Sequence, residues 1–156
     1  MTVSGLEDFT ATLQQLGDQA GPIMKMAVYA GADKMIGEVK NAIKALPTQD
    51  GYMKEGKRSV VTEDEKRDLL DHVGIAKIDN EGGNANTAIG FNGYSSHKTR
   101  KYPNGVPIPL IARSIESGSS VRKKIPFLRK AGKAATEKVQ QAMLETAAAE
   151  FNKLTK

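Results

Sequence analysis

Apolar residues recur at helical spacing close to the N-terminus. They stand at intervals of three, four and three residues, in Leu6, Phe9, Leu13 and Leu16. This spacing places them on one face of an α-helix. Ser4 precedes the run and is a favourable N-cap residue, and Gly17 follows it. The pattern therefore predicts a short amphipathic helix over residues 4 to 17.

A longer apolar stripe with the same periodicity follows between Pro22 and Pro47. Its members are Met24, Val28, Gly31, Met35, Val39, Ala42 and Leu46. Proline suits the first turn of a helix and stops a helix that reaches it, so we expect a second helix from Pro22 to Leu46. Small residues at Ala27, Ala30, Gly31 and Ala42 would allow close packing. The C-terminal helix and a neighbouring subunit are both candidates for that packing, and core packing within the chain is the plainer interpretation.

The middle of the chain combines short elements with turns. Residues 47 to 58 indicate a loop that enters a short strand at Ser59 to Val61. Thr62 and Glu65 have the capping-box spacing, which predicts a brief helix that ends near His72, with Leu69 and Leu70 facing inward. The runs GIAKID and TAIGFN flank the tip NEGGNAN, which predicts a β-hairpin.

Basic and turn-forming residues dominate the stretch after the hairpin. Residues 93 to 108 predict an exposed, flexible basic loop. Pro109 then opens a short helix that carries Leu110, Ile111 and Ile115 and ends at Gly118. The segment SSVRKKIP is expected to be extended, and Pro126 opens a last helix that runs to about Leu154.

These elements together predict the fold class. We expect one α+β domain over residues 1–156, with long N- and C-terminal helices packed on a small antiparallel β-sheet and a loop-rich middle. The chain has no cysteine, which excludes disulfides, thiolate metal sites and cysteine nucleophiles. The N-terminus lacks the pattern of a signal peptide, and no apolar run approaches the roughly 20 residues that span a bilayer. We therefore expect neither export by a signal peptide nor a membrane partner.

Residues for chemistry are few. His72 and His97 are the two histidines, and Asp68, Asp71 and His72 are the one grouping that resembles a metal site. A solvated helix face is the more common role of such a group. The sequence has no dinucleotide-binding, phosphate-loop or serine-hydrolase motif. We expect a protein that is not an enzyme and that uses no cofactor and no metal.

Positive charge is concentrated in the C-terminal third. Residues 101 to 156 hold eleven Lys and Arg against four Asp and Glu, and between Lys98 and Lys133 ten basic residues accompany one acid, Glu116. Three interpretations remain open. The region contacts a DNA duplex without sequence specificity, it meets acidic residues of a partner subunit, or it forms a basic surface in water.

Two motifs in a fixed order lie in residues 111 to 135, IARSIESGSSVRKKIPFLRKAGKAA. The first is Ala-x-x-x-Glu-x-Gly, matched by Ala112, Glu116 and Gly118. After a basic stretch, the second opens the last helix and comprises Pro126, Phe127, Leu128, Arg129 and Ala131. This block resembles the C-terminal part of neck proteins of long-tailed bacteriophages, the tail-completion or head-tail joining proteins of the lambda Z type. The rest of the chain is similar more loosely, and residues 62 to 73 look like an added element.

The resemblance implies a structural virion protein at the junction between neck and tail, assembled in the cytoplasm of a bacterial host. It implies a homo-oligomeric ring, expected to be a hexamer that matches the six-fold symmetry of the tail. The ring would bind head-completion and tail-terminator or tail-tube proteins and surround double-stranded DNA. A basic, architectural DNA-binding protein is the alternative. Candidate interface or DNA-channel residues are Arg113, Glu116, Arg122, Lys123, Lys124, Phe127, Arg129 and Lys130, with loop candidates Lys98, Arg100, Lys101 and Tyr102.

A physical role for the block follows from its own residues. Gly118 ends one helix, the basic segment reaches outward, and Pro126 with Phe127 anchors the chain again. Residues 119 to 125 then either add to the sheet edge of a neighbouring subunit, touch the tail lumen, or form an ordinary strand within the domain.

Overall fold

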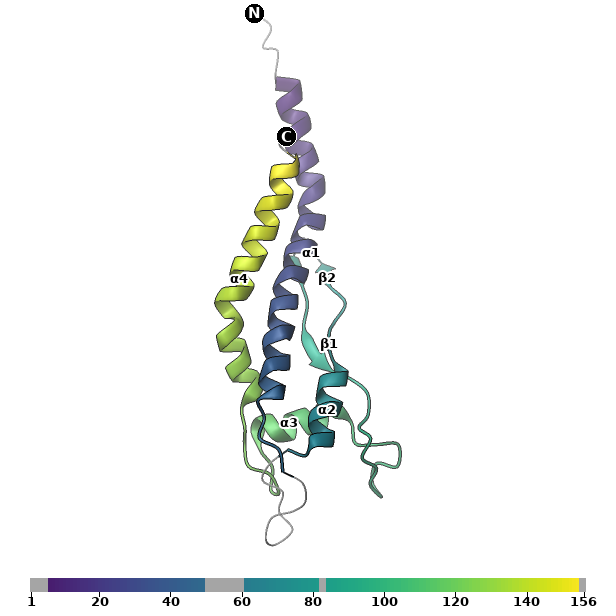
Figure 1. The fold of residues 1–156 in the computed structure, drawn as a ribbon. Coiled ribbons are helices and arrows are strands. Elements are labelled where there is room, and N and C mark those ends of the chain that lie inside the picture. The colour runs from purple at the N-terminus through teal and green to yellow at the C-terminus, as the bar shows by residue number, and fades with distance from the viewer. Residues whose placement is uncertain (1–5, 50–60, 82–83, 155–156) are drawn as a thin grey trace, which may run out of the picture. The chain divides into compact units, whose positions relative to one another are not determined.

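A computed structural model describes residues 6–49, 61–81 and 84–154 (Figure 1). In these ranges the chain forms four helices and two antiparallel two-stranded sheets. The helices are α1 (Leu6–Lys44), α2 (Glu63–His72), α3 (Ile108–Ser117) and α4 (Phe127–Leu154). The predicted α+β class, with long helices towards both ends and a small antiparallel sheet, is confirmed.

The chain divides into two compact units, which are described separately. The core unit comprises residues Met35–Ala76 and Ile89–Thr136, and the terminal unit comprises Met1–Lys34, Lys77–Ala88 and Glu137–Lys156. Both long helices contribute to both units, because the unit boundaries fall within α1 and α4. Every candidate residue named from the sequence lies in the core unit.

The predicted break between two N-terminal helices is wrong. α1 is one helix of 39 residues that passes through both Gly17 and Pro22. A glycine inside a helix costs only about 1 kcal/mol relative to alanine, and a buried apolar face can outweigh that penalty. Pro22 is followed directly by a buried residue, Ile23, which is 4% exposed, and by buried Ala27 one turn later. The proposed cap Ser4 lies outside the described residues.

The buried face of α1 differs in part from the predicted stripe. Val39 and Leu46 are buried as expected, whereas Met24 is 39% exposed and its neighbour Ile23 is buried. Ile43, absent from the predicted stripe, is fully buried. Periodicity alone does not fix which of two adjacent apolar residues faces inward, and here the stripe is offset by one position at its start.

The capping box of α2 is confirmed. The Glu65 amide donates to Thr62 Oγ1 at 3.2 Å, and the Thr62 amide donates to Glu65 Oε2 at 3.1 Å. The helix ends at His72 and buries Leu69, as predicted. Val61, just before the cap, forms an isolated bridge with Thr48, while residues 59 and 60 of the predicted strand lie outside the described residues.

The predicted hairpin consists of two short ladders. In the core unit, β1 (Val73–Ile75) pairs with β4 (Ile89–Phe91), with Val73 opposite Phe91. In the terminal unit, β2 (Asp79–Glu81) pairs with β3 (Asn84–Asn86). The two glycines at the tip, residues 82 and 83, lie outside the described residues.

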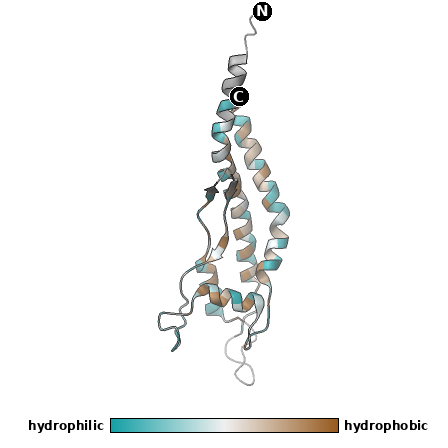
Figure 2. Cartoon of the chain, turned by 180° about the vertical axis from the view of Figure 1, so that it is seen from behind, coloured by the Kyte–Doolittle hydropathy of each residue, from teal (hydrophilic) through white to brown (hydrophobic). Residues whose placement is uncertain are grey.

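The core unit has one hydrophobic cluster to which most of its elements contribute. It contains Val39, Ile43, Leu46, Val61, Leu69, Val73, Ile108, Ile111, Ala112, Ile115, Phe127 and Ala131. The predicted α3 and α4 are confirmed, and α3 begins one residue before Pro109. In Figure 2 the helices carry apolar residues beside hydrophilic ones, as expected of amphipathic helices with one buried face.

In the terminal unit α1 and α4 approach each other at Gly31. A Cβ atom added to Gly31 would lie 2.7 Å from Met143 Cγ and 3.2 Å from Val139 Cγ1. Of the two predicted partners for the small residues of α1, the C-terminal helix is therefore confirmed at this position. Among the described residues, no helix has the length and apolar character needed to cross a membrane.

Candidate interaction surface and buried ion pair

Nine of the ten basic residues between Lys98 and Lys133 are exposed on the core unit. Three lie in the loop before α3 and one on α3; five lie after the turn that follows α3 and on α4. They are Lys98, Arg100, Lys101, Arg113, Lys123, Lys124, Arg129, Lys130 and Lys133. We call these nine side chains the basic surface. Tyr102 is half-buried, and the Lys101 ammonium lies 5.6 Å from the centre of its ring.

The basic loop is connected to α2 and to itself by hydrogen bonds. The Ser96 amide and hydroxyl both donate to Asp68 Oδ2, at 3.0 and 3.1 Å. The Ser95 amide donates to the Val106 carbonyl at 2.8 Å, and Gly105, with φ of 108°, lets the chain pass close to the Ser95 carbonyl. These bonds give the loop a defined path, and its mobility stays a prediction.

Glu116 has a role within the chain, and its role at an interface stays a prediction. Its carboxylate accepts hydrogen bonds from the amides of Leu128 at 2.8 Å and Arg129 at 3.2 Å. These are unpaired donors of the first turn of α4, where a negative charge also interacts favourably with the helix dipole. The Glu of the first motif therefore caps the helix that the second motif opens.

Phe127 is also removed from the surface. Its side chain is 3% exposed, and its ring centre lies 6.5 Å from that of Phe91, tilted by 58°. The burial agrees with the predicted role of Phe127 as an anchor after Pro126, and its ring is not on the surface of the core unit. Phe127 fixes the start of α4 against the hydrophobic cluster.

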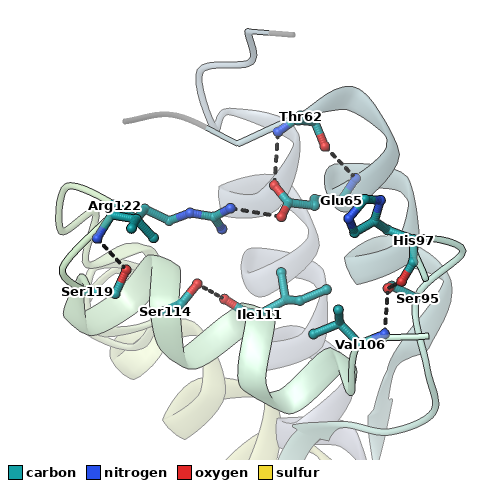
Figure 3. A network of polar contacts seen from close by, with 10 residues as sticks. Thr62, Glu65, Ser95, His97, Val106, Ile111, Ser114, Ser119 and Arg122 are labelled. Carbon is teal, nitrogen blue, oxygen red and sulfur yellow. Dashed lines mark hydrogen bonds and ion pairs between the residues drawn. The ribbon is translucent and has the colours of Figure 1, made fainter. Parts of the chain in front are cut away.

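Arg122 departs furthest from the predicted basic surface, because it is buried. Its side chain is 6% exposed, and its Nη2 donates to Glu65 Oε1 at 2.8 Å (Figure 3). The other carboxylate oxygen of Glu65 accepts the bond from the Thr62 amide. One glutamate thus caps α2 and neutralises an arginine that lies 57 residues further along the chain.

The segment around Arg122 begins as a tight turn and not as an extended strand. The Ser119 amide donates to the Arg122 carbonyl at 2.9 Å, and the Arg122 amide donates back to the Ser119 carbonyl at 3.3 Å. Gly118, with φ of 79°, allows this turn to follow α3 directly. Because these backbone groups bind one another, residues 119 and 122 do not offer a sheet edge to a neighbour.

A small cavity lies beside the ion pair. It has a volume of about 230 Å³ and is lined by Glu65, His97, Val106, Leu110, Ile111, Ser114, Ser119, Val121 and Arg122. We call it the Arg122 pocket. Arg122 Nη1 is buried and has no hydrogen-bond partner in the described part of the chain. Leu110 and Val121 are 43% and 53% exposed.

A second cavity, of about 470 Å³, lies where α1 ends and α4 begins. Small and apolar side chains such as Ala42, Leu46 and Ala131 line most of it, and Glu38 and Lys130 bring charge. Of the candidate residues, Phe127 and Lys130 meet here.

The grouping that resembled a metal site is used in other ways. Both bonds from Ser96 end on Asp68, and the His72 ring places Nδ1 2.9 Å from the Asp68 carbonyl. Within residues 6–49, 61–81 and 84–154, no three His, Cys, Asp or Glu side chains come close enough to hold a metal ion.

Sequence reasoning missed the partnership between Glu65 and Arg122. Glu65 was recognised as half of a capping box, and Arg122 was counted with its basic neighbours Lys123 and Lys124. One signal in the sequence could have indicated the difference. Arg122 falls within the turn that Gly118 starts, so its side chain need not be exposed like those of the lysines that follow. Comparison with known proteins gives no further guidance, since no family model, no curated protein and no solved structure significantly matches this chain.

Proposed function

We propose that the protein is a structural component of a long-tailed phage or prophage, where it joins head and neck to the tail as part of a homo-oligomeric ring. The observation that carries the proposal is the corner between α3 and α4. The motif residues that resemble the neck proteins meet there: Ala112 is buried in α3, Glu116 caps α4, Gly118 makes the turn, and Phe127 and Ala131 anchor α4.

Each of these motif residues supports the local structure and none performs chemistry, as expected of the characteristic motif of an assembly protein. The motif links the end of α3 to the start of α4 through the hydrogen bonds of Glu116, with Lys123 and Lys124 exposed on the connection and Arg129 exposed in the first turn of α4. A corner that is held by hydrogen bonds and carries exposed charges suits recognition of a partner subunit or of a DNA backbone.

Exposed apolar residues of the terminal unit also favour assembly. Met24, Met26 and Tyr29 of α1 are 39%, 45% and 51% exposed, and Leu144 of α4 is 71% exposed. Met26 and Tyr29 are three residues apart and so share one face of α1, and neighbouring exposed apolar side chains often mark protein interfaces. A ring needs two different complementary faces, because its subunits contact one another head to tail.

Ring formation tests the proposal. The purified full chain, alone or mixed with the head-completion and tail-terminator proteins encoded beside it, should give closed rings in negative-stain images and a matching mass by mass photometry. Met26→Glu should reduce the ring fraction at least tenfold, whereas Gln140→Glu, a charge at an exposed polar position, should not. A chain that stays monomeric with all of these partners contradicts the proposal.

The basic surface favours a second candidate, non-specific DNA binding by a monomer or dimer. Nine exposed cations accompany one buried arginine in this region. The affinity for a short duplex would then fall with salt, with a log-log slope of about −0.9 for each phosphate contacted. Lys123→Gln with Lys124→Gln should make that slope shallower by up to about 2. Strong salt-dependent binding without rings would favour this candidate.

A further inference from the structure

We propose that the Arg122 pocket docks an extended segment of another protein, which inserts one aliphatic side chain and presents a main-chain carbonyl oxygen to Arg122 Nη1. The proposal goes beyond a role at the neck and does not depend on which particle contains the protein. It rests on the unpaired donor, the local charge balance, and the size and rim of the pocket.

The unpaired nitrogen is the first step. Arg122 is 8% exposed, and its Nη2 atom donates to Glu65. Its Nη1 atom is buried and has no acceptor among the described residues. Buried polar groups in native proteins are nearly always hydrogen-bonded, and a charged donor is especially costly to leave unpaired. An acceptor supplied by a binding partner would resolve this deficit.

The charge balance selects a neutral acceptor. Glu65 lies 2.8 Å from Arg122 and already neutralises the guanidinium. A second carboxylate bonded to Nη1 would be desolvated and would be repelled by the Glu65 carboxylate. A peptide carbonyl oxygen accepts the same bond without bringing charge into the pocket.

Of the polar groups that line the pocket, which also include His97 and Ser119, Arg122 Nη1 is the buried donor that lacks an acceptor among the described residues. The Ser114 hydroxyl donates to the Ile111 carbonyl at 3.0 Å, and the Ser119 hydroxyl accepts from the Val121 amide at 3.4 Å. Figure 3 shows the Arg122 guanidinium on the same side of the network as Ser114 and Ser119, with the Ile111 side chain next to it.

The Arg122 pocket is large enough for one side chain of a partner protein and too small for a typical cofactor. Its volume of about 230 Å³ lies below the roughly 300–1,000 Å³ of pockets that take drug-sized molecules. Val106 and Ile111 provide apolar lining, and the exposed side chains of Leu110 and Val121 extend the apolar surface beyond the pocket. An aliphatic side chain fits the interior, and the chain that carries it would cover the rim.

A defined probe tests the site in the full chain. N-acetyl-leucine methylamide carries one aliphatic side chain and uncharged carbonyls, so it represents the proposed segment. In a titration followed by NMR, it should shift the Ile111 and Val121 methyl signals and the Arg122 guanidinium signal to saturation, with a Kd on the order of 1 mM. N-acetyl-glycine methylamide, without the side chain, and N-acetyl-leucine, with a carboxylate, should each bind at least tenfold more weakly.

Two variants separate binding from folding. Arg122→Lys keeps a cation for Glu65 but removes the second amino group, and Leu110→Glu alters only the exposed rim; each should weaken probe binding at least tenfold. Leu144→Glu, an exposed residue of the terminal unit, should leave binding unchanged. Equal, non-saturating shifts with all three probes, or wild-type binding by Leu110→Glu, would overturn the proposal. Rings are scored separately, so failure here leaves the neck proposal standing.

Discussion

The core unit and the terminal unit share two long helices but use their apolar residues differently. The core unit buries large side chains such as Ile43, Leu69 and Ile115, all at 0% exposure. The terminal unit buries Ile23 and small residues such as Ala27 and Ala32, while Met26, Tyr29 and Leu144 are exposed. The difference indicates that the core unit supplies most of the folding stability and that the terminal unit retains apolar surface for other contacts.

Charge separates the two units as well. The core unit contains 17 Lys and Arg against nine Asp and Glu, whereas the terminal unit contains six against nine. In the ring that we propose, the basic unit of one subunit would contact the acidic unit of the next, with charge directing the encounter and apolar burial stabilising it.

The largest expected effect comes from breaking the ion pair of the core unit. Glu65→Ala leaves Arg122 as an uncompensated buried charge and removes one of the two hydrogen bonds of the α2 capping box, so we expect a loss of about 3–5 kcal/mol in the free energy of unfolding. Asp64→Ala is the matched control, because Asp64 binds Arg67 at 2.5 Å with both side chains more than 60% exposed. That exposed pair should contribute less than about 1 kcal/mol. Urea denaturation measures both, and equal losses would mean that Glu65 and Arg122 are as solvated as the surface pair.

Truncation of one apolar side chain in each unit tests whether the core unit supplies most of the folding stability. Ile115→Ala removes a fully buried side chain and should cost about 2–5 kcal/mol. Leu144→Ala removes an apolar side chain that is 71% exposed and should change the free energy by no more than about 0.5 kcal/mol. Both values come from chemical denaturation of the monomer. A cost above about 2 kcal/mol for Leu144→Ala would show that the terminal unit has a core of its own.

Local patterns in the sequence identified most of the elements of this fold. Thr62 with Glu65 gave the start of α2, Gly118 gave the end of α3, and Pro126 gave the start of α4, because each residue type solves a backbone problem at a helix end. The prediction from local pattern was wrong at Gly17 and Pro22, because these residues usually interrupt a helix but here lie inside α1. Whether a helix continues through them depends on packing that no local window contains.

The candidate site was predicted less completely than the fold. Composition located the basic surface, because nine of the ten basic residues that the charge count singles out are exposed. Arg122, Glu116 and Phe127 belong to the same stretch of sequence but are used within the chain. Arg122 binds Glu65 and Phe127 packs against Phe91, and both partners lie outside this stretch. Glu116 binds the first amides of α4, 12 or more residues further along the chain. The sequence therefore indicated the charge and size of these side chains, whereas their exposure depends on tertiary contacts.

The smallest effect concerns the close approach within the terminal unit. Gly17→Ala adds a methyl group where nothing lies within 4 Å and should stabilise the helix by about 1 kcal/mol. Gly31→Ala has the same gain in helix propensity, but its methyl group would lie 2.7 Å from Met143 Cγ and 3.2 Å from Val139 Cγ1. Met143 is flexible and can move, whereas the β-branched Val139 is stiff, so the gain should be cancelled or reversed. Thermal melting should show a higher midpoint for Gly17→Ala and an unchanged or lower one for Gly31→Ala. Equal stabilisation by both substitutions would show that α1 and α4 do not touch at this point, and the terminal unit would then lack this contact between its two helices.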